Sequence, residues 1–342
     1  MSKRLSEVPS LNGETQRVHA AVTAIGGYVP DRVVSNEELE RRLGLELGWI
    51  EQRTGIRSRR YAPKELRSSE ACVRAVHDLT TRYGMDLSDI DLVIAGGMTP
   101  DDLVPGTACR VQNALGLRRA GAFDIQAACA SFMHALHVAE GLVVAGSARK
   151  VLVVCGELAS HIVDPCDRAT VAVFGDGAGA VVVEAAPRSS FRAHTAGTDG
   201  SSASWLHRPD PMFVNRDSTS SNGPIYLHMQ GREIYRWVID TMPTEIECLL
   251  ERAGLDIGSV DWFVPHGANA RMLAHLCDQI ELPKERMLTS LERHGNTGAA
   301  SIPLALVHGV ETGRLQKDQT LLAFGFGAGL SFAGSVLEWT AS

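Results

Sequence analysis

A cysteine at a predicted strand-to-helix junction is the residue of this chain best suited to covalent chemistry. Cys129 follows a strand-like run and several small residues, and an apolar helix pattern comes after it. The first turn of a helix has unpaired N–H groups and the positive end of the helix dipole, which favour a thiolate and can hold an oxyanion. The alternative is an inert buried thiol, because cysteine is among the most often buried residue types.

Two further residues could assist a nucleophilic cysteine, which needs a base or partner and groups that hold developing negative charge. His266 follows the strand-like run 262–264, and a side chain at a strand end meets a cleft. Asn296 lies in a Gly-Asn-Thr-Gly turn that opens a helix. Taken alone, such a histidine is more often packed or at the surface, and such an asparagine is typical of turn chemistry.

An internal repeat relates these residues to one another. Residues 84–97 resemble residues 254–267 at an offset of 170, and residues 174–179 resemble residues 324–329 at an offset of 150. In the first pair, each member follows an amphipathic helix pattern and supplies a loop and a buried strand. The chain therefore reads as two copies of one α/β unit that meet near residues 186–190.

The repeat also predicts where the candidate residues meet. Because the offsets differ, the first copy has about twenty more residues than the second, and we expect part of this surplus at residues 157–170. Cys129 and Asn296 lie at comparable points of the two copies, each before a helix. Pseudo-twofold packing would bring both to one interface, with His266 approaching from the same half as Asn296.

The strand pattern predicts the layers. Apolar runs without strict alternation, such as residues 92–95 and 151–155, are typical of strands buried on both faces. Alternating strands and helices predict a mixed, largely parallel sheet covered by helices, so two packed copies give five layers. Residues 175–179 have a dinucleotide-like glycine spacing but lead into a β-rich run, which indicates a tight hairpin or a close backbone approach instead.

Composition excludes several classes of function. The 342 residues carry a net charge of -7 and no basic run longer than residues 57–60, which argues against nucleic-acid binding. No apolar stretch is long enough to span a bilayer, and the polar residues 1–17 read as a flexible N-terminal extension, not a signal peptide. The seven cysteines include no C-x-x-C pair, and the 12 histidines show no metal-ligand spacing. We therefore expect a cytoplasmic protein with reduced thiols and without a metal, a membrane or a nucleic-acid partner.

The motifs, taken in order from about residue 18 onward, resemble the β-ketoacyl-acyl-carrier-protein synthase III family of thiolase-fold condensing enzymes. They are Gln126-Ala-Ala-Cys129, Asp164-Pro-Cys-Asp-Arg-Ala-Thr170, Phe174-Gly-Asp-Gly-Ala-Gly179, His266-Gly-Ala-Asn-Ala-Arg271, Gly295-Asn-Thr-Gly-Ala-Ala-Ser-Ile-Pro303 and Gly325-Phe-Gly-Ala-Gly-Leu-Ser-Phe332. The resemblance implies a thiolase fold, in which duplicated βαβαβαββ halves form a five-layer αβαβα sandwich. It implies a half carrying the nucleophile at residues 18–187, and a half carrying the histidine and asparagine at residues 188–342.

The resemblance also implies catalytic roles. Cys129 accepts an acyl group as a thioester, and His266 and Asn296 promote decarboxylation of a malonyl-type extender. Loss of carbon dioxide puts negative charge on the thioester oxygen, which two neutral donors, the imidazole Nε2–H and the asparagine amide, stabilise without quenching the carbanion. Backbone N–H groups would form the oxyanion hole for the following attack on the acyl thioester. The residues implied for this hole are Cys129, Gly327, Ala328 and Gly329.

Recognition of the substrate is implied for a second group of residues. Trp49, Arg53 and Arg168 would stack on the adenine or contact the phosphates of coenzyme A, since an aromatic face and planar guanidinium groups suit that task. Arg271 would lie near the surface that docks an acidic carrier protein. From the residues alone, Trp49 could be a core residue, and Arg53 and Arg271 solvated charges. The remaining substrate-binding candidates are Val104, Met229, Tyr235 and Asn269.

Departures from the family pattern bear on the substrate. Gly267 stands where the family often has Gln, Gln126 where Asn is usual, and Ser131 where Gly is usual. Val104 occupies a position from which a bulkier Phe of the partner subunit often closes the acyl pocket. The smaller side chain predicts a deeper or differently shaped pocket.

One long segment is a further departure. Residues 201–224 include Trp205, Met212 and Phe213, and a loop this rich in large side chains predicts an unusual acyl or acceptor site. These departures favour polyketide or other natural-product assembly over primary fatty-acid initiation.

The leading hypothesis is a ping-pong condensing enzyme that forms a homodimer. Its substrates would be coenzyme A or phosphopantetheine thioesters, delivered as acyl-CoA or on an acyl carrier protein, with no tightly bound cofactor. The alternative is an acyltransferase that moves the acyl group from Cys129 to a non-malonyl acceptor, with His266 as general base. A catalytically silent partner subunit is disfavoured, because Cys129, His266 and Asn296 are all present.

Overall fold

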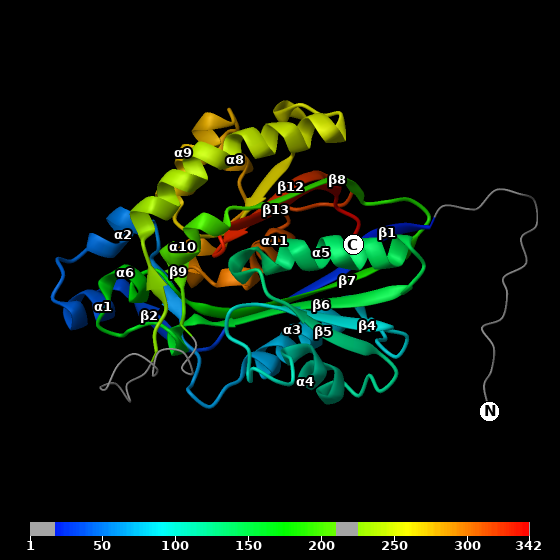
Figure 1. Ribbon diagram of the computed structural model, residues 1–342, viewed down its shortest axis with the longest axis horizontal. Helices are drawn as coiled ribbons and strands as arrows, with labels where there is room; N and C mark the ends of the chain where they lie inside the picture. Colours follow the sequence, from blue (N-terminus) through cyan, green and yellow to red (C-terminus); the bar gives the residue numbers. More distant parts are fainter. Residues whose placement is uncertain (1–17, 210–224, 342) are drawn as a thin grey trace, which may run out of the picture.

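The computed structural model describes residues 18–209 and 225–341, and these residues form five layers (Figure 1). Two β-sheets enclose a central layer of helices, and other helices cover the outer face of each sheet. The predicted α/β class and five-layer αβαβα sandwich are therefore confirmed. The extension predicted at residues 1–17 lies outside the described residues, as do Met212 and Phe213.

The first sheet has five strands in the order β1-β7-β6-β4-β5. β4 runs parallel to β5 and β6, whereas β7 runs antiparallel to β1 and β6. β6 is buried along its whole length, as its valine-rich run predicts. The strand bounds are β1 His19–Tyr28, β4 Leu92–Gly96, β5 Gly121–Ile125, β6 Lys150–Leu158 and β7 Asp176–Ala186.

The second sheet has four strands in the order β11-β12-β13-β8. β11 is parallel to β12, and β13 is antiparallel to β12 and β8. The strands β4-β6-β7-β1 of the first sheet have the same order and the same relative directions, so the two sheets repeat one pattern and β5 is an additional edge strand. The bounds are β8 Phe191–Thr198, β11 Trp262–Pro265, β12 Thr320–Gly327 and β13 Ser331–Glu338.

Helices form the other three layers. α3 and α4 cover the first sheet, α5 and α11 lie between the sheets, and α8 and α9 cover the second sheet (Figure 1). α11 buries eight of its 11 residues, as expected for a helix packed between two sheets. The bounds are α3 Ser68–Tyr83, α4 Thr107–Ala114, α5 Ser131–Val144, α8 Gly231–Ala253, α9 Ala270–Gln279 and α11 Ser301–Glu311.

Shorter elements gather mostly at one end of the sheets, on the left of Figure 1. They are β2 Val33–Ser35, α1 Asn36–Leu43, α2 Trp49–Thr54, β3 Ser58–Arg60, α6 Arg168–Val171, β9 Leu206–His207, β10 His228–Met229 and α10 Leu291–His294. The 3-10 turns are η1 Ala128–Ala130, η2 Ala159–His161, η3 Gly200–Trp205, η4 Ile257–Ser259, η5 Lys284–Arg286 and η6 Gly298–Ala300. Of these turns, η1 and η6 lead directly into the central helices α5 and α11.

Strand direction was predicted wrongly. The sheets are mixed, but they are not largely parallel: among the described strands of the two large sheets, four neighbouring pairs are antiparallel and three are parallel. The physical reason is that the last strand of each half returns beside its predecessor, as β7 does beside β6 and β13 beside β12.

The sequence repeat is also only partly matched by the structure. Residues 174–179 enter β7, whereas residues 324–329 end β12, so this pair does not occupy equivalent positions. The surplus of the first copy lies between β6 and β7, at residues 159–175, where the second copy has only residues 328–330. A Cβ at Gly179 would lie 2.4 Å from Pro303, which confirms the close backbone approach. The division of the chain at residue 187 stays a prediction.

Candidate active site

A strained turn positions Cys129. Ala128, the residue before it, has a φ of 48°, in the left-handed region that alanine rarely adopts. Two side chains hold this backbone: the Ser131 hydroxyl accepts the Ala127 N–H at 2.9 Å, and Gln126 Oε1 accepts the Ala128 N–H at 3.3 Å. The turn directs Cys129 into a cavity between the two halves.

The surroundings of the Cys129 thiol are apolar. The residue is 3% exposed, and its Sγ lies 3.9 Å from Met98 Sδ. Burial raises the pKa of the Cys129 thiol, and the nearby Glu157 carboxylate raises it further. The expectation that the helix start favours a thiolate is therefore wrong for this structure, because desolvation outweighs that effect.

A glycine leaves room beside the Cys129 backbone. β12 passes so close to η1 that a Cβ at Gly327 would lie 2.8 Å from Cys129 N and 3.0 Å from Cys129 Cβ. Cys129 and Gly327 line the same cavity, whereas Ala328 and Gly329 line an adjoining hollow. Any side chain at position 327 would therefore cover the Cys129 N–H.

His266 follows β11 and is held on three sides. Its backbone N–H donates to Phe324 at 2.8 Å, its ring meets Phe326 edge-on at 5.2 Å, and its Nδ1 lies 2.7 Å from the Ser301 hydroxyl. Desolvation lowers the pKa of the His266 imidazole to about 3, and a hydrogen bond with the Gly298 backbone opposes this only in part. The ring is therefore neutral at neutral pH.

Asn296 is fixed through both its backbone and its side chain. Its N–H donates to Val173 at 2.9 Å, and its carbonyl accepts the Gly175 N–H at 2.9 Å. Its side-chain Oδ1 accepts the Gly298 N–H at 2.9 Å. The oxygen of the amide is thus engaged, which leaves the Nδ2 donors for the cavity.

The structure brings these residues to one cavity of about 120 Å³. Sequence-predicted residues that line it are Cys129, Met229, Tyr235, His266, Asn269, Asn296 and Gly327. The other lining residues are Val173, Phe174, Leu206, Gly231, Ile234, Ala268, Met272 and Phe326. The cavity therefore joins the Cys129 thiol and four polar side chains, those of Tyr235, His266, Asn269 and Asn296, within an otherwise apolar wall.

Trp49 and Arg53 of α2 lie together with Arg168, which comes from a distant part of the sequence. The Arg53 guanidinium lies 4.4 Å from the centre of the Trp49 ring, and that of Arg168 lies 5.9 Å from it. Both arginines are exposed, and Trp49 is half-buried. The three side chains thus form a basic aromatic cluster that does not line the cavity itself.

Asn269 joins this cluster to the cavity. Its Nδ2 donates to the Arg53 carbonyl at 3.2 Å, and its Oδ1 caps α9 by accepting the Arg271 N–H at 2.9 Å. Capping of this kind satisfies a free N–H at a helix start. Arg271 is exposed in the first turn of α9.

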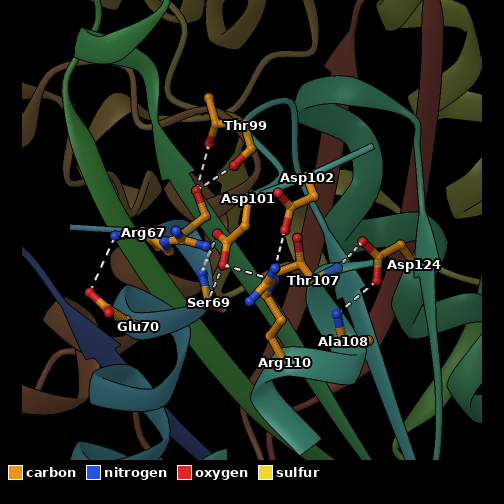
Figure 2. Close-up of polar contacts among 11 residues, drawn as sticks. Arg67, Ser69, Glu70, Thr99, Asp101, Asp102, Thr107, Ala108, Arg110 and Asp124 are labelled. Carbon is orange, nitrogen blue, oxygen red and sulfur yellow. Dashed lines mark hydrogen bonds and ion pairs between the residues drawn. The ribbon is translucent and has the colours of Figure 1, made fainter. Parts of the chain in front are cut away.

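The loop between β4 and α4 carries Val104 away from the cavity of its own chain. Val104 is 86% exposed and Leu103 is 81% exposed. Figure 2 shows how the loop is held: the Asp101 carboxylate accepts the Ser69 N–H at 3.0 Å and lies 3.8 Å from Arg110. A firmly anchored loop therefore presents two apolar side chains outward.

A second hollow, of about 420 Å³, adjoins the cavity at Leu206. Its wall includes Met98 and Leu227, and its rim carries His207 and Arg208. Trp205 of the predicted substrate loop lies in η3, beside this rim.

Sequence reasoning missed several residues of the site. Ser301 holds His266, Met98 touches the thiol, and Glu157 lies fully buried beneath the turn η6. Ser301 lies inside the motif of residues 295–303, and its place in that motif was the only available signal. The sequence around Met98 and Glu157 contained no signal that placed them in the site.

The five-layer fold and its central cavity define the class of thiolase-fold enzymes. Two family models match the chain: 3-oxoacyl-[acyl-carrier-protein] synthase III over residues 123–200, and the C-terminal part of the same synthase over residues 250–339. The chain is 42% identical to β-ketoacyl-[acyl-carrier-protein] synthase III 2 of Bacillus subtilis over 321 residues, which cover 94% of this chain and 98% of that protein.

Solved structures agree with these matches. The synthase III of Thermus thermophilus is 40% identical with a TM-score of 0.88, covering 94% of this chain and 100% of that one. The priming β-ketosynthase of the R1128 polyketide pathway is 36% identical with a TM-score of 0.91, covering 97% and 99%. The chain belongs to the β-ketoacyl-acyl-carrier-protein synthase III family and is a condensing transferase of this type. Within residues 18–209 and 225–341, no helix is long and apolar enough to cross a membrane.

Proposed function

We propose that the protein catalyses a ping-pong reaction in which Cys129 is acylated and the acyl group is then condensed with a malonyl thioester. The observation that carries this proposal is the single cavity shared by a cysteine, a neutral histidine and an asparagine whose amide oxygen is already engaged. A thiol supplies the covalent carrier, and two neutral donors suit an enolate.

In the first half-reaction, Cys129 Sγ attacks the carbonyl carbon of an acyl thioester. The C–S bond to the leaving thiolate breaks, and that thiolate takes the proton of the Cys129 thiol. The raised pKa of Cys129 means that this proton is still present when the substrate arrives. The Cys129 N–H, beside Gly327, and an N–H of the loop that contains Ala328 and Gly329 hold the oxyanion.

In the second half-reaction, the malonyl thioester loses carbon dioxide and becomes an enolate. His266 Nε2–H and Asn296 Nδ2–H donate to the enolate oxygen. Its carbon attacks the acyl-Cys129 carbonyl, the C–Sγ bond breaks, and the thiolate of Cys129 takes up a proton from solvent. The products are a β-ketoacyl thioester, carbon dioxide and the free thiol.

The proposed substrates are acyl-CoA and acyl-carrier-protein thioesters, with no tightly bound cofactor. The cluster of Trp49, Arg53 and Arg168 has the aromatic face and the cations that an adenine and phosphates require. Arg271, exposed at the start of α9, is proposed to meet the acidic carrier protein. Met229, Tyr235 and Asn269 line the cavity and are proposed to contact the thioester arm.

The proposed biological role is priming of polyketide or fatty-acid assembly. Similarity to the R1128 priming ketosynthase supports a role in polyketide assembly. The departures from the family pattern at Val104 and in residues 201–224 support the same role. The apolar hollow beside the cavity offers additional room for an acyl chain.

A homodimer is proposed from three exposed apolar side chains on one side of the first sheet. Leu103 and Val104 project from their anchored loop, and Phe123 on the edge strand β5 is 39% exposed. An edge strand has free backbone groups that can pair with another chain. Val104 would then reach the acyl pocket of the partner.

The decisive experiment is to incubate the protein with a panel of acyl-CoAs and acyl-carrier proteins and weigh the product by intact-protein mass spectrometry. Wild type should gain one acyl mass, and Cys129→Ala should gain none. Cys109→Ala, which removes an exposed cysteine, is the matched control and should load normally. Labelling of Cys129→Ala would show that the nucleophile is another residue.

Release of labelled carbon dioxide from a malonyl thioester separates condensation from simple acyl transfer. A condensing enzyme releases one carbon dioxide for each β-ketoacyl product. An acyl-Cys129 enzyme that passes its acyl group to an alcohol or amine without this release would establish the alternative acyltransferase.

A further inference from the structure

The turn that carries Cys129 has a counterpart in the other half of the molecule. η1 (Ala128–Ala130) leads into α5 as η6 (Gly298–Ala300) leads into α11, and the turns are 170 residues apart, 298 minus 128. The first residue of each turn has a left-handed φ, 48° in η1 and 54° in η6. By this correspondence Ala299 is the equivalent of Cys129.

The same hydrogen bond holds both turns. Gln126 Oε1 accepts the Ala128 N–H at 3.3 Å, and Asn296 Oδ1 accepts the Gly298 N–H at 2.9 Å. Each acceptor stands two residues before its donor. Asn296 is therefore the counterpart of Gln126, and its orientation depends on the geometry of η6.

A buried carboxylate fills the counterpart of the Cys129 site. Glu157 is fully buried, and its Oε2 accepts the Ala299 N–H at 3.2 Å. Its Oε1 accepts the Met98 N–H at 2.9 Å and the Thr99 hydroxyl at 3.0 Å. Three donors from both halves of the chain thus converge on one side chain.

Glu157 and Gly327 occupy equivalent positions on β6 and β12, again 170 residues apart, 327 minus 157. At Gly327 the missing side chain leaves space beside the Cys129 N–H, whereas at the equivalent place the Glu157 carboxylate fills that space and binds the Ala299 N–H. One half therefore presents an open backbone anion site, and the other holds the chain's own carboxylate in it.

Gly298 connects this carboxylate to Asn296. A Cβ at position 298 would lie 2.4 Å from Glu157 Oε2, so the carboxylate packs directly against the Gly298 backbone. The Gly298 N–H binds Asn296 Oδ1 at 2.9 Å. A movement of the Glu157 carboxylate would therefore shift Gly298 and, with it, the Asn296 amide.

We infer that Glu157 is a positioning residue for the condensation step: by filling the anion site of η6, it fixes Gly298 and so orients the Asn296 amide. This inference rests on the proposed function, since that function assigns condensation to Asn296 together with His266. Glu157 does not line the cavity and acts only through the turn.

The ionisation of Glu157 should make its positioning role measurable in a pH profile of condensation. Burial raises the pKa of Glu157 to about 7, and Asp176 on β7 adds to the rise. The thiols of Cys129 on η1, Cys155 on β6 and Cys72 on α3 also face its charge. The Met98 and Ala299 N–H groups can only donate, so the ionised carboxylate is the form that holds the turn, and condensation should fall as the pH drops through about 7.

The test compares acyl loading with carbon dioxide release in Glu157→Gln. The amide has one acceptor oxygen, and its NH₂ group opposes the N–H donors, so we expect the rate of malonyl decarboxylation to fall about 10- to 100-fold. Acyl loading of Cys129 should be unchanged or faster, because removal of the Glu157 charge lowers the Cys129 pKa. The fall in condensation rate near pH 7 should be absent from the pH profile of the residual activity.

Asp176→Asn is the matched control. Asp176 is also fully buried, and its carboxylate accepts the Ala62 N–H at 2.7 Å and the Ser160 N–H at 2.8 Å. This variant should lose stability in thermal unfolding but keep both rates above pH 7. The pH at which condensation falls should move below 7, because the Asp176 charge that helps to raise the Glu157 pKa is gone. Equal effects of Asp176→Asn and Glu157→Gln on decarboxylation would reduce Glu157 to a structural role and overturn the inference.

Gly298→Ala provides a second route if Glu157→Gln does not fold. Its Cβ pushes on the carboxylate, so decarboxylation should fall while Cys129 still loads. If wild type releases no carbon dioxide, the proposed function itself fails. The other adverse result is that wild type releases carbon dioxide while Glu157→Gln or Gly298→Ala keeps the wild-type rate and pH profile. That result would show that only the positioning role is wrong.

Discussion

The protonation state of His266 decides what it can do at the residue scale. Burial lowers its pKa to about 3, so the imidazole is neutral at neutral pH. Ser301 lies 2.7 Å from Nδ1, and a hydroxyl that donates to Nδ1 leaves the proton on Nε2. A neutral Nε2–H can stabilise an enolate oxygen without protonating the carbanion. His266 therefore suits the role of a hydrogen-bond donor better than that of an acid.

Substitutions at His266 test this assignment. His266→Ala should lower carbon dioxide release by about 10²- to 10³-fold, the usual effect of removing one oxyanion donor. His266→Gln keeps an N–H donor and should retain more of the rate, and the fall in condensation rate attributed to Glu157 near pH 7 should survive in it. Disappearance of that fall in His266→Gln would show that the imidazole, and not Glu157, titrates near pH 7, and would contradict its role as a neutral donor.

Sequence reasoning could reach the residues of the cavity but not those that hold them. Cys129, His266 and Asn296 lie in motifs whose residue types suit the proposed chemistry. Ser301 meets His266 across 35 residues of sequence, and Glu157 meets Ala299 across 142. Such contacts depend on how the two halves pack, which no local pattern describes.

At the scale of elements, the turn η1 places Cys129 directly after a residue with a strained backbone. Ala128 has a φ of 48°, although the equivalent residue of η6 is a glycine that accommodates a φ of 54° readily. Cys129, the proposed nucleophile, follows directly after this alanine. The left-handed backbone is thus held by its surroundings, including the Ser131 hydroxyl.

Ala128→Gly should relieve this strain. The free energy of unfolding should rise by up to about 1 kcal/mol. Removal of about 1 to 2 kcal/mol of left-handed strain is partly offset by about 0.5 to 1 kcal/mol of extra entropy in the unfolded glycine chain. Ala130→Gly is the control in the same turn: its φ is -82°, so the added flexibility should lower the free energy of unfolding by about 0.5 to 1 kcal/mol. Urea denaturation of both variants measures the difference, and a loss of stability in Ala128→Gly would show that η1 is unstrained.

Periodicity predicted the elements better than their directions. The amphipathic patterns gave α3 and α8, and the unbroken apolar runs gave β4 and β6, because burial of a face imposes a local pattern. Parallel and antiparallel strands that are buried on both faces share that pattern. The antiparallel return of β7 and β13 therefore could not be read from it.

At the scale of the whole molecule, the two sheets differ at one edge. The first sheet has the additional strand β5, whose Phe123 is partly exposed, and the neighbouring loop presents Leu103 and Val104 to solvent. Exposed apolar side chains beside an unpaired strand edge are costly in an isolated chain. Pairing of this edge with a second copy would remove both costs and place Val104 at the partner's acyl pocket.

This argument predicts a dimer that depends on the β4–α4 loop. Light scattering should give wild type twice the mass of one chain, and Val104→Asp should weaken association by at least about tenfold, because a charge replaces an apolar contact at the interface. Val33→Asp, at a 51% exposed position on β2, is the matched control and should remain dimeric. The same dilution series should show Val104→Asp losing acyl loading as it dissociates, since each pocket would lose the side chain that the partner supplies. A monomeric wild type, or Leu103→Asp and Val104→Asp variants that associate as tightly as wild type, would refute the role of this edge.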